Sequence, residues 1–313
     1  MVERKLVKQG VATLMVSLPS KWLRKNHLIK GDGVEVEEKT NKLILSSKKI
    51  FSGKKEITIK ITKENEHNLK NILTHIYRKG FDVIIIEDID SELLKKVRKI
   101  TTDLLLGFEI TKRESKQCVV ENISEPIEQK YQVMLKKTFL LIQEMQNLIL
   151  EDFLQEKFNN KNEIEEIKNQ QDKFILFCRR LLIKEQSNNL LEWELLTFLM
   201  HIQHSYYYLY EYVEANKIKK NNIIIKSLKD LQNYFSLFYD SYYNKNMESI
   251  NKINHLKNKY QFGEVLKLIE TSKTKDAVIF SYIREIFRLI QIGTSPILGE
   301  ILESNQDQSS ISA

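Results

Sequence analysis

The pattern of hydrophobic and polar positions changes twice along the chain and divides it into three regions. In residues 13–45, apolar and polar side chains alternate in short runs separated by turn-forming residues, a pattern typical of half-buried strands. In residues 57–121, strand-like runs alternate with helical ones. From residue 124 onward, apolar residues recur every three or four positions, as on one face of a helix. The pattern predicts an α+β protein whose C-terminal part is mostly helical.

The first region is predicted to hold four short strands and one short helix. A strand over residues 13–18 follows a break at Gln9 and Gly10. Pro19 suits the first turn of a helix because its φ is already near the helical value, and Trp22 on that helix can face a core. The remaining elements are a turn at 31–33, a strand from 34 to 36, a turn at 40–41 and a strand from 43 to 45. A polar, basic linker is expected over residues 46–55.

The second region is predicted to be a compact segment with the order β-α-β-α-β-β. Its elements are a strand over 57–61, a helix over 64–77, a strand over 81–86, a helix capped by Ser91, and strands over 108–111 and 118–121. Glu87, Asp88 and Asp90 cluster at the end of a strand. They could hold a metal ion, but acids before a helix start more often form a capped, solvated loop. No catalytic motif is expected in this segment.

The third region is predicted to contain six helical stretches in two sets of three, which indicates an internal repeat of pattern rather than of sequence. The first helix is expected to begin at Pro126, and the last to be interrupted at residues 293–296, where Pro296 should kink or break the helix. The polar tail from Ser304 is expected to be disordered. The predicted helices are 127–153, 164–182, 190–213, 224–242, 247–269 and 277–302.

Composition limits the classes of function. The 313 residues are 42% hydrophobic, enough for folded cores, and no apolar run approaches the ~18 residues that span a bilayer. An N-terminus with acid, base and glycine predicts a cytoplasmic protein without membrane insertion. Cys118 and Cys178 lie outside any Cys-x-x-Cys spacing, so we expect buried free thiols. The chain has no phosphate-binding loop or nucleophile–base motif, so we do not expect an enzyme.

Positive charge is concentrated at the N-terminus. Residues 1–30 hold seven basic residues and one acid, a net charge of +6 (7 minus 1), whereas the whole chain carries +7. A basic module of this kind is typical of proteins that bind the phosphate backbone of DNA. The alternative is a solvated basic face without a partner. The candidate DNA-binding residues are Arg4, Lys5, Lys8, Lys21, Arg24 and Lys25.

The N-terminal motif resembles a known family. The sequence SLPSKWLRKN followed by LIKGDGVEVE, with a strand ending in Leu-Pro, a helix carrying tryptophan and Gly-Asp before an alternating strand, resembles the AbrB family of swapped-hairpin transcription factors. The resemblance implies a homodimer that exchanges hairpins and binds double-stranded DNA. Dimerisation is also physically sensible, because about 45 residues have too little interior to be stable alone.

The order of the three regions is similar to that of archaeal phosphate-uptake regulators, which join AbrB and PhoU domains. The resemblance implies five parts: an AbrB-like module (1–48), a small α/β segment (55–123), two PhoU-like three-helix repeats (124–216 and 217–303) and a tail (304–313). It also implies a regulator of phosphate uptake whose helical domain senses or relays phosphate status, with phosphate transporter components or their signalling partners as further partners. The alternative is a PhoU-like interaction protein whose hairpin module only dimerises.

The chain departs from the PhoU pattern at the positions of its metal-binding carboxylates. Lys168 stands four residues before Asp172, where an acid is expected, and Met200 and His204 stand where Glu and Asp are expected. In the second half, Asn251 and His255 occupy the corresponding spacing. We therefore expect no multinuclear metal cluster and no cofactor. His201 and His204, beside Asp172, could form an altered metal site, although histidines on a bundle helix more often bond within the core or face solvent.

Overall fold

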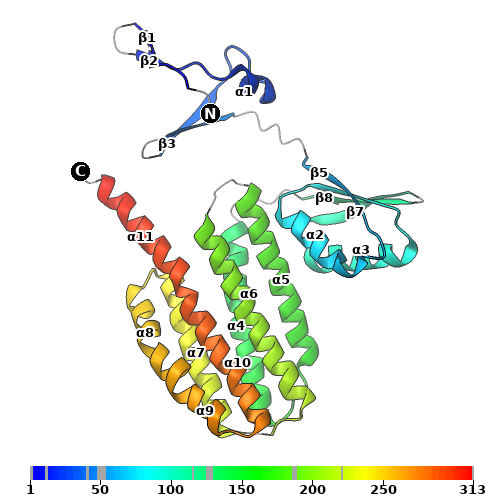
Figure 1. Cartoon of the computed structure of the whole chain (residues 1–313), viewed down its shortest axis with the longest axis vertical. Coiled ribbons are helices and arrows are strands. Elements are labelled where there is room, and N and C mark those ends of the chain that lie inside the picture. The colour runs from blue at the N-terminus through cyan, green and yellow to red at the C-terminus, as the bar shows by residue number, and fades with distance from the viewer. Residues whose placement is uncertain are drawn as a thin grey trace. The chain divides into compact units, whose positions relative to one another are not determined.

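A computed structural model of the chain describes residues 3–10, 13–39, 42–47, 54–114, 116–124, 130–184, 189–219 and 221–311. The chain divides into two compact units, Met1–Lys55 and Glu56–Ala313, which we call the N-terminal module and the body. Figure 1 shows small sheets in the module, a further sheet with helices in the body, and a set of long helices after it. The α+β class predicted from the sequence is confirmed.

The N-terminal module consists of two separate antiparallel hairpins and a short helix between them. The strands and helix are β1 (Val7–Gln9), β2 (Thr13–Met15), α1 (Ser20–Lys25), β3 (Val34–Lys39) and β4 (Lys42–Ser47). The predicted order of strand, strand, helix, strand, strand is confirmed, and the segments with alternating apolar and polar residues form strands. Gly10 at φ +73° and Gly31 at φ +96° occupy left-handed conformations that favour glycine in the connecting turns. The predicted turn at 40–41 and most of the predicted linker lie outside the described residues.

Two local predictions in the module differ from the structure. β2 ends at Met15 rather than at residue 18, because β1 is only three residues long and its first residue, Val7, already pairs with Met15. Pro19 precedes α1 as its N-cap, with φ −63° and ψ 125°, instead of lying in the first turn. The fixed φ of proline suits both positions, and the extended ψ is what places Pro19 just outside the helix.

The body begins with a four-stranded sheet and two helices. Its elements are β5 (Glu56–Lys60), the 3₁₀ turn η1 (Glu66–Asn68), α2 (Leu69–Arg78), β6 (Val83–Glu87), α3 (Ser91–Leu104), β7 (Phe108–Glu114) and β8 (Gln117–Asn122). The strand order is β5-β6-β8-β7, with β5 and β6 parallel and the other pairs antiparallel. Because α2 connects the parallel pair, this is a β-α-β unit with a hairpin added, as the sequence predicts.

The acidic residues at the end of β6 have separate roles. The Asp90 side chain accepts a hydrogen bond from the Leu93 backbone N–H at 2.8 Å, so Asp90, rather than the predicted Ser91, caps α3. Asp88 pairs with Lys60 at 2.5 Å. Within the described ranges, no three His, Cys, Asp or Glu side chains gather closely enough to hold a metal ion. The cluster therefore has the geometry of a capped loop.

Long helices form the rest of the body. They are α4 (Lys130–Gln155), α5 (Lys161–Lys184), α6 (Leu190–Ala215), α7 (Asn222–Tyr243), α8 (Met247–Lys257), the π-helical segment η2 (Asn258–Glu264), α9 (Val265–Thr271), α10 (Thr274–Ile292) and α11 (Thr294–Ile311). The helix is interrupted within the predicted residues, because α10 ends before Gly293 and α11 begins after it, but Pro296 does not make the break: it lies in the first turn of α11, where its missing N–H costs no hydrogen bond. The predicted helix start at Pro126 lies outside the described residues. The backbone is helical to Ile311, where the sequence predicts a disordered tail; no proline or glycine follows Gly299 to interrupt α11.

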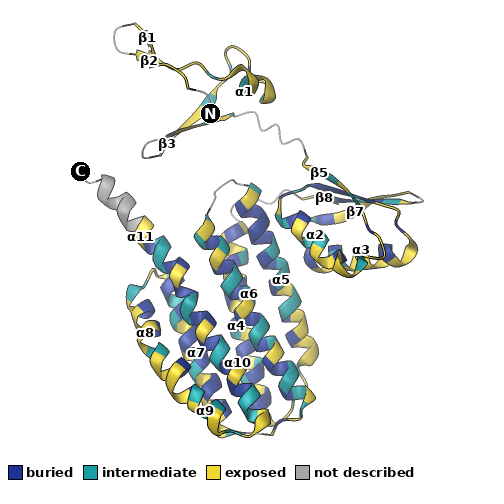
Figure 2. Cartoon of the chain, in the orientation of Figure 1, coloured by how far each residue is buried: buried dark blue, intermediate teal, exposed yellow. Residues whose placement is uncertain are grey.

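The two predicted sets of three helices share one hydrophobic core. α4 packs against α7 and α6 packs against α10, so the second set covers the first. Figure 2 shows buried positions running along the inward faces of these helices. Phe139 on α4 is fully buried and its ring lies 5.6 Å from that of Tyr242 on α7. The apolar periodicity that predicted each helix thus also supplies the contact between the sets.

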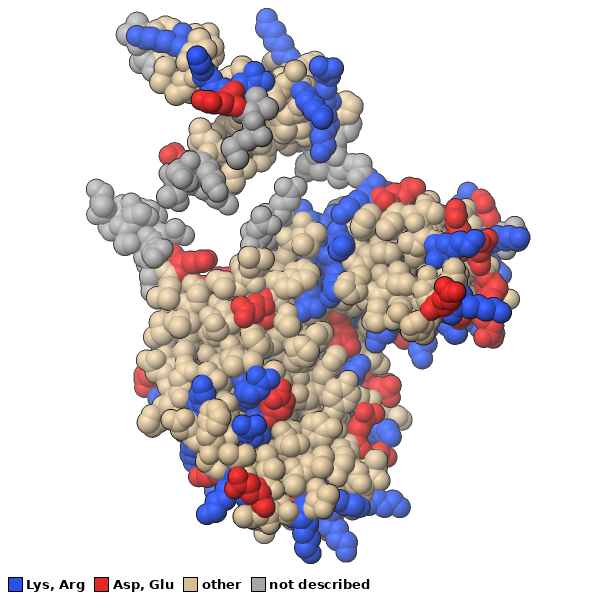
Figure 3. Space-filling view, in the orientation of Figure 1, with Lys and Arg blue, Asp and Glu red and all other residues tan. Residues whose placement is uncertain are grey.

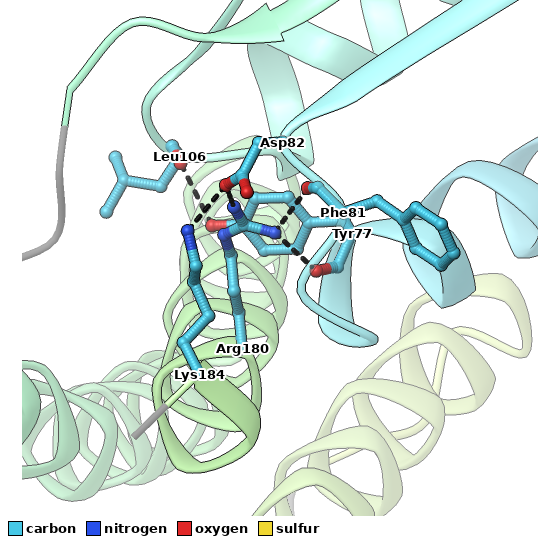
Figure 4. Close-up of polar contacts among 6 residues, drawn as sticks. All are labelled: Tyr77, Phe81, Asp82, Leu106, Arg180 and Lys184. Carbon is cyan, nitrogen blue, oxygen red and sulfur yellow. Dashed lines mark hydrogen bonds and ion pairs between the residues drawn. The ribbon is translucent and has the colours of Figure 1, made fainter. Parts of the chain in front are cut away.

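A buried ionic network attaches the sheet segment to α5 (Figure 4). Arg180 on α5 donates to Asp82 at 2.5 Å and to the backbone carbonyls of Tyr77 and Phe81 at 2.9 and 2.6 Å. Lys184 also donates to Asp82, at 2.5 Å. The Arg180 guanidinium lies over the Tyr77 ring at 5.1 Å. Because the Tyr77 carbonyl lies in the last turn of α2 and the Phe81 carbonyl lies in the segment that follows this helix, Arg180 fixes the end of α2 against the bundle.

The two cysteines are free and fully buried, as predicted, but in different places. Cys118 lies in the hydrophobic cluster of the sheet segment, and Cys178 lies in that of the bundle. Burial raises the pKa of the Cys118 thiol to about 11 and also raises the pKa of Cys178. In the part of the chain that the structure describes, no helix has both the length and the apolar character needed to cross a membrane.

Candidate functional site

The predicted DNA-binding residues are all exposed in the N-terminal module, and Figure 3 shows lysine and arginine side chains over this unit. α1 carries three of them. Lys21, Arg24 and Lys25 are spaced by three and four residues, so they share one side of the helix. Trp22 and Leu23 are half-buried on the other side. The helix therefore presents a basic face to solvent while its apolar face lies against the module.

The other three candidates lie at the first hairpin. Arg4 and Lys5 precede β1, and Lys8 lies on β1 opposite Leu14 of β2. Among the described residues, none of the six candidate side chains is paired with an acid. The positive charge of these six side chains is consequently not paired with acids in the described part of the chain, which leaves it available to an anionic partner.

The second hairpin has one apolar face. Paired residues of an antiparallel ladder point to the same side, and Val36 pairs with Leu45 while Val34 and Leu43 lie on that side too. Val36 and Leu43 are 57% and 65% exposed. Leu28 is the one hydrophobic residue of the module that is buried among the residues described there. A hairpin face of this kind lacks the cover that a folded β-sheet requires.

The three metal candidates in the helical part, Asp172, His201 and His204, are only partly brought together. His204 Nε2 on α6 lies 2.9 Å from Asp172 on α5, and Lys168 approaches the same carboxylate at 3.2 Å. His201 lies on the exposed side of α6. Burial alone raises the pKa of the Asp172 carboxyl, but the hydrogen bond and charge of His204, together with Lys168, outweigh burial and leave that pKa below its usual value. Asp172 is thus an ion-paired carboxylate.

The same region contains a pocket that the sequence did not reveal. It has a volume of about 230 Å³ and lies between α2, α5 and α6. Arg179, only 4% exposed, is part of its lining, and burial lowers the pKa of Arg179 to about 10, with the nearby charge of Arg78 adding to the effect. The lining residues are Lys70, Asn71, Thr74, His75, Arg78, Leu104, Asp172, Ile175, Leu176, Arg179, Met200 and His204.

The sequence contains a signal for buried arginines at this place, although not for the pocket itself. Arg179 and Arg180 occupy consecutive positions in an otherwise apolar stretch of a bundle helix, FILFCRRLLI. Arginine is almost never fully buried unless it is paired, so two of them in such a stretch indicate specific partners. One partner of Arg180 is Asp82, about a hundred residues away in the sequence. The sequence offers no way to pair residues at that separation.

A buried carboxylate lies between the two sets of helices. Glu192 on α6 accepts hydrogen bonds from the hydroxyl of Tyr131 on α4 at 2.6 Å and from that of Tyr242 on α7 at 2.7 Å. Burial raises the pKa of Glu192, although the two tyrosine hydrogen bonds act in the opposite direction. Both hydroxyls are satisfied donors, so this group has the geometry of a structural link.

Comparison with known proteins yields no relative: no family model, no curated protein and no solved structure matches this chain.

Proposed function

We propose that this protein is a dimeric, DNA-binding transcriptional regulator in which two N-terminal modules form one DNA-binding unit. The observation that supports the proposal is the combination of an uncovered apolar face and unpaired basic side chains in a single small module. Neither feature alone points to a regulator. Together they fit a unit that completes its core with a second copy and presents its charge to DNA.

Exposed apolar surface supports the dimer. Nine large hydrophobic side chains of the module are exposed among its described residues, on both hairpins and beside α1. Burial of such surface contributes about 25 cal/mol per Å², and fully burying one valine or leucine contributes about 1.5–3 kcal/mol. A second copy offers the same faces, so each hairpin can cover an identical or complementary hairpin in a two-fold arrangement. The nine residues are Leu6, Val7, Leu14, Met15, Val16, Ile29, Val36, Leu43 and Ile44.

Charge supports DNA as the ligand of the dimer. Five candidates, each present twice, place ten basic groups on one assembly: Arg4, Lys5, Lys8, Arg24 and Lys25. Lysines mainly position the phosphate backbone, whereas arginine offers a planar fork for guanine edges. We assign base contact to Arg4 and Arg24 and backbone contact to the lysines, including Lys21.

The proposal extends to phosphate regulation through the resemblance to phosphate-uptake regulators. In that extension the body senses or relays phosphate status, and phosphate transporter components or their signalling partners are its contacts. The extension rests on domain order and on the N-terminal motif. Recovery of bound DNA fragments from cells grown with and without phosphate tests it, because the proposal requires fragments whose enrichment depends on phosphate.

Salt-dependent DNA binding is the sharpest test of the module. If about six phosphates are neutralised, log affinity should fall with log salt at a slope of about −5, since each phosphate releases about 0.9 of a counterion. The triple variant Arg4→Ala, Lys5→Ala, Arg24→Ala should lose affinity, sequence preference and part of this slope. Measurement by fluorescence anisotropy at several salt concentrations gives all three quantities.

A matched control removes three basic residues from the body. Lys95, Arg98 and Lys99 are exposed on α3, and changing all three to alanine alters the net charge by the same amount. This control should bind DNA as the unaltered chain does. Unchanged DNA binding by the module variant would overturn the assignment. A wild-type dimer that binds no DNA would favour the alternative, an interaction protein whose hairpins only dimerise.

A further inference from the structure

Two consecutive arginines on α5 have opposite surroundings. Arg180 is neutralised, because its guanidinium contacts the Asp82 carboxylate, and it also donates to the backbone carbonyls of Tyr77 in α2 and Phe81 just after it. Arg179 has no comparable partner. Its Nη2 donates to the hydroxyl of Thr197 on α6 at 2.8 Å, and its guanidinium lies 5.1 Å from the Trp193 ring. A hydroxyl and an aromatic face do not neutralise a positive charge.

The Arg179 side chain also has a polar atom without a partner. Its Nε is buried, and no acceptor among the described residues reaches it. Buried polar groups in folded proteins nearly always have a hydrogen-bond partner, and an exception calls for an explanation such as an absent ligand. Because Arg179 is 4% exposed, bulk water cannot compensate its charge. An anion in the adjoining pocket would supply both the missing charge and the missing acceptor.

The groups around Arg179 strengthen the positive field in the pocket. Lys70, His75 and Arg78 on α2 line it from the sheet segment, and the Arg78 guanidinium lies 2.7 Å from a ring nitrogen of His75. Partial burial, followed by the charges of Arg78, Lys79 and Arg179, lowers the pKa of His75, as expected in a positive environment.

The one acid in the lining does not cancel this field. Asp172 is already engaged by His204 at 2.9 Å and by Lys168 at 3.2 Å. Those two contacts occupy both carboxylate oxygens, since His204 approaches Oδ1 and Lys168 approaches Oδ2. The charge of Asp172 also acts on Arg179, but burial and the charge of Arg78 outweigh it, so the pKa of Arg179 stays lowered, and neither arginine of the pocket forms an ion pair with Asp172 among the described contacts.

We propose that this pocket between α2, α5 and α6 is a binding site for a small tetrahedral oxyanion, inorganic phosphate or sulfate, held by Arg179 and Arg78. The proposal deepens the proposed function by giving the body a ligand class, and it rests on that function only for its regulatory meaning. The volume of about 230 Å³ is below the ~300–1,000 Å³ typical of pockets for larger organic ligands, so a small ion fits. Arginine forks match the oxygens of such ions.

The position of the pocket gives the anion a structural consequence. α2 belongs to the sheet segment, whereas α5 and α6 belong to the bundle. An anion held by Arg78 from one side and Arg179 from the other connects these two parts of the body at a second point, beside the Arg180 network. Ligand binding should therefore stabilise the folded body, because only the folded state brings the two arginines together.

Binding is tested on the full chain by isothermal titration with phosphate and, separately, with sulfate at constant ionic strength. We expect saturable binding of at least one of them, and its preference identifies which anion the site serves. Arg78→Gln and Arg179→Gln should each weaken binding at least tenfold, whereas Arg98→Gln, an exposed arginine on α3, should leave it unchanged. Arg78 is on the surface of α2, so its variant keeps the test valid should Arg179→Gln fail to fold. No saturable binding at millimolar anion, or equal binding by all three variants, would overturn the proposal.

Tryptophan fluorescence provides a local readout. The chain has two tryptophans, and Trp193 lies against Arg179 while Trp22 is in the N-terminal module. In a Trp22→Phe chain, phosphate or sulfate should change the Trp193 emission saturably, with the same midpoint as the titration. A titration signal without any emission change would place the ion elsewhere and count against the site. Anion binding needs no DNA, so the Arg4→Ala, Lys5→Ala, Arg24→Ala chain should retain it even if the DNA proposal fails.

Discussion

The N-terminal module and the body use apolar residues in opposite ways. Nine large hydrophobic side chains are exposed among the described residues of the module, which spans 55 residues, whereas ten are exposed in the body, which spans 258 (313 minus 55). The described module has one buried hydrophobic residue, Leu28, while fully buried rings such as Phe139 fill the bundle. Both units are built from strands and helices, but the body buries its apolar side chains within itself, whereas the N-terminal module leaves most of its described ones exposed.

The difference bears on the dimer that we propose. A chain segment of this size buries too small a share of its surface to be stable alone, so its missing partner surface has to come from outside the unit. In the body, helix packing has already covered the apolar stripes. Variants that damage one unit should therefore leave the other intact, and the following predictions are ordered by the size of the expected effect.

The largest effect is expected from Phe139→Ala in the bundle. Phe139 is fully buried and its ring contacts Phe235 and Phe238 as well as Tyr242, so it joins the two sets of helices. Truncation should reduce the free energy of unfolding by about 3–5 kcal/mol, the range for a buried phenylalanine. Urea unfolding followed by circular dichroism measures it. Dimerisation through the module should persist, and its loss would show that the two units are not independent.

The next effect concerns the connection within the body. Asp82→Asn removes the carboxylate charge that faces the buried guanidinium of Arg180. The expected cost is about 3 kcal/mol, because breaking a buried ion pair on one side leaves an uncompensated charge. Asp88→Asn is the control, since its pair with Lys60 is exposed. If urea unfolding gave the two variants the same stability, the loss of a buried ion pair would cost no more than the loss of an exposed one, contrary to this prediction.

A smaller effect, and one confined to the module, is expected from Leu43→Ser. Leu43 belongs to the uncovered apolar face of the second hairpin. If a second copy covers it, the substitution should weaken the dimer by about 1.5–3 kcal/mol, or roughly tenfold to a hundredfold. The matched control is Leu140→Ser, which changes an exposed leucine on α4 and should leave the affinity of the dimer unchanged. Sedimentation equilibrium measures the dissociation constant of the dimer for each chain. A wild-type chain that is monomeric at micromolar concentration would contradict the proposed dimer itself.

The smallest effect depends on pH. Because the pKa of Glu192 is raised in the folded state, its contribution to stability is fully present below its unfolded pKa and is lost as pH rises through the folded pKa. Glu192→Gln removes this dependence. In unfolding measurements at a series of pH values between about 4 and 8, the free energy of unfolding of the Gln variant should therefore rise relative to that of the wild type as the pH increases. Glu194→Gln, exposed on the same helix, should show no such trend. A constant difference across the range would refute the assignment.

The elements were predictable because they depend on local pattern. Alternation around Val34 and Val36 and the helical period from residue 130 to 302 gave the strands and helices in their correct order. The cap of α3 was misassigned by one residue, since Asp90 and Ser91 are both good caps and only the observed bond to Leu93 decides between them. The pocket at Arg179 could not be predicted. Its walls come from α2 and α6, and their approach depends on contacts such as Arg180 to Asp82 between distant residues.

Each of the two hydrophobic clusters of the body contains one buried cysteine, whose rate of chemical labelling reports how often that cluster opens. Cys118 is enclosed by the sheet segment and Cys178 by the bundle, and burial disfavours the reactive thiolate of both. A thiol reagent can therefore modify each sulfur only at the rate at which its own surroundings open. Peptide-resolved labelling of the untagged protein thus separates the lifetime of the sheet segment from that of the bundle, with the anion added or withheld, in a single reaction.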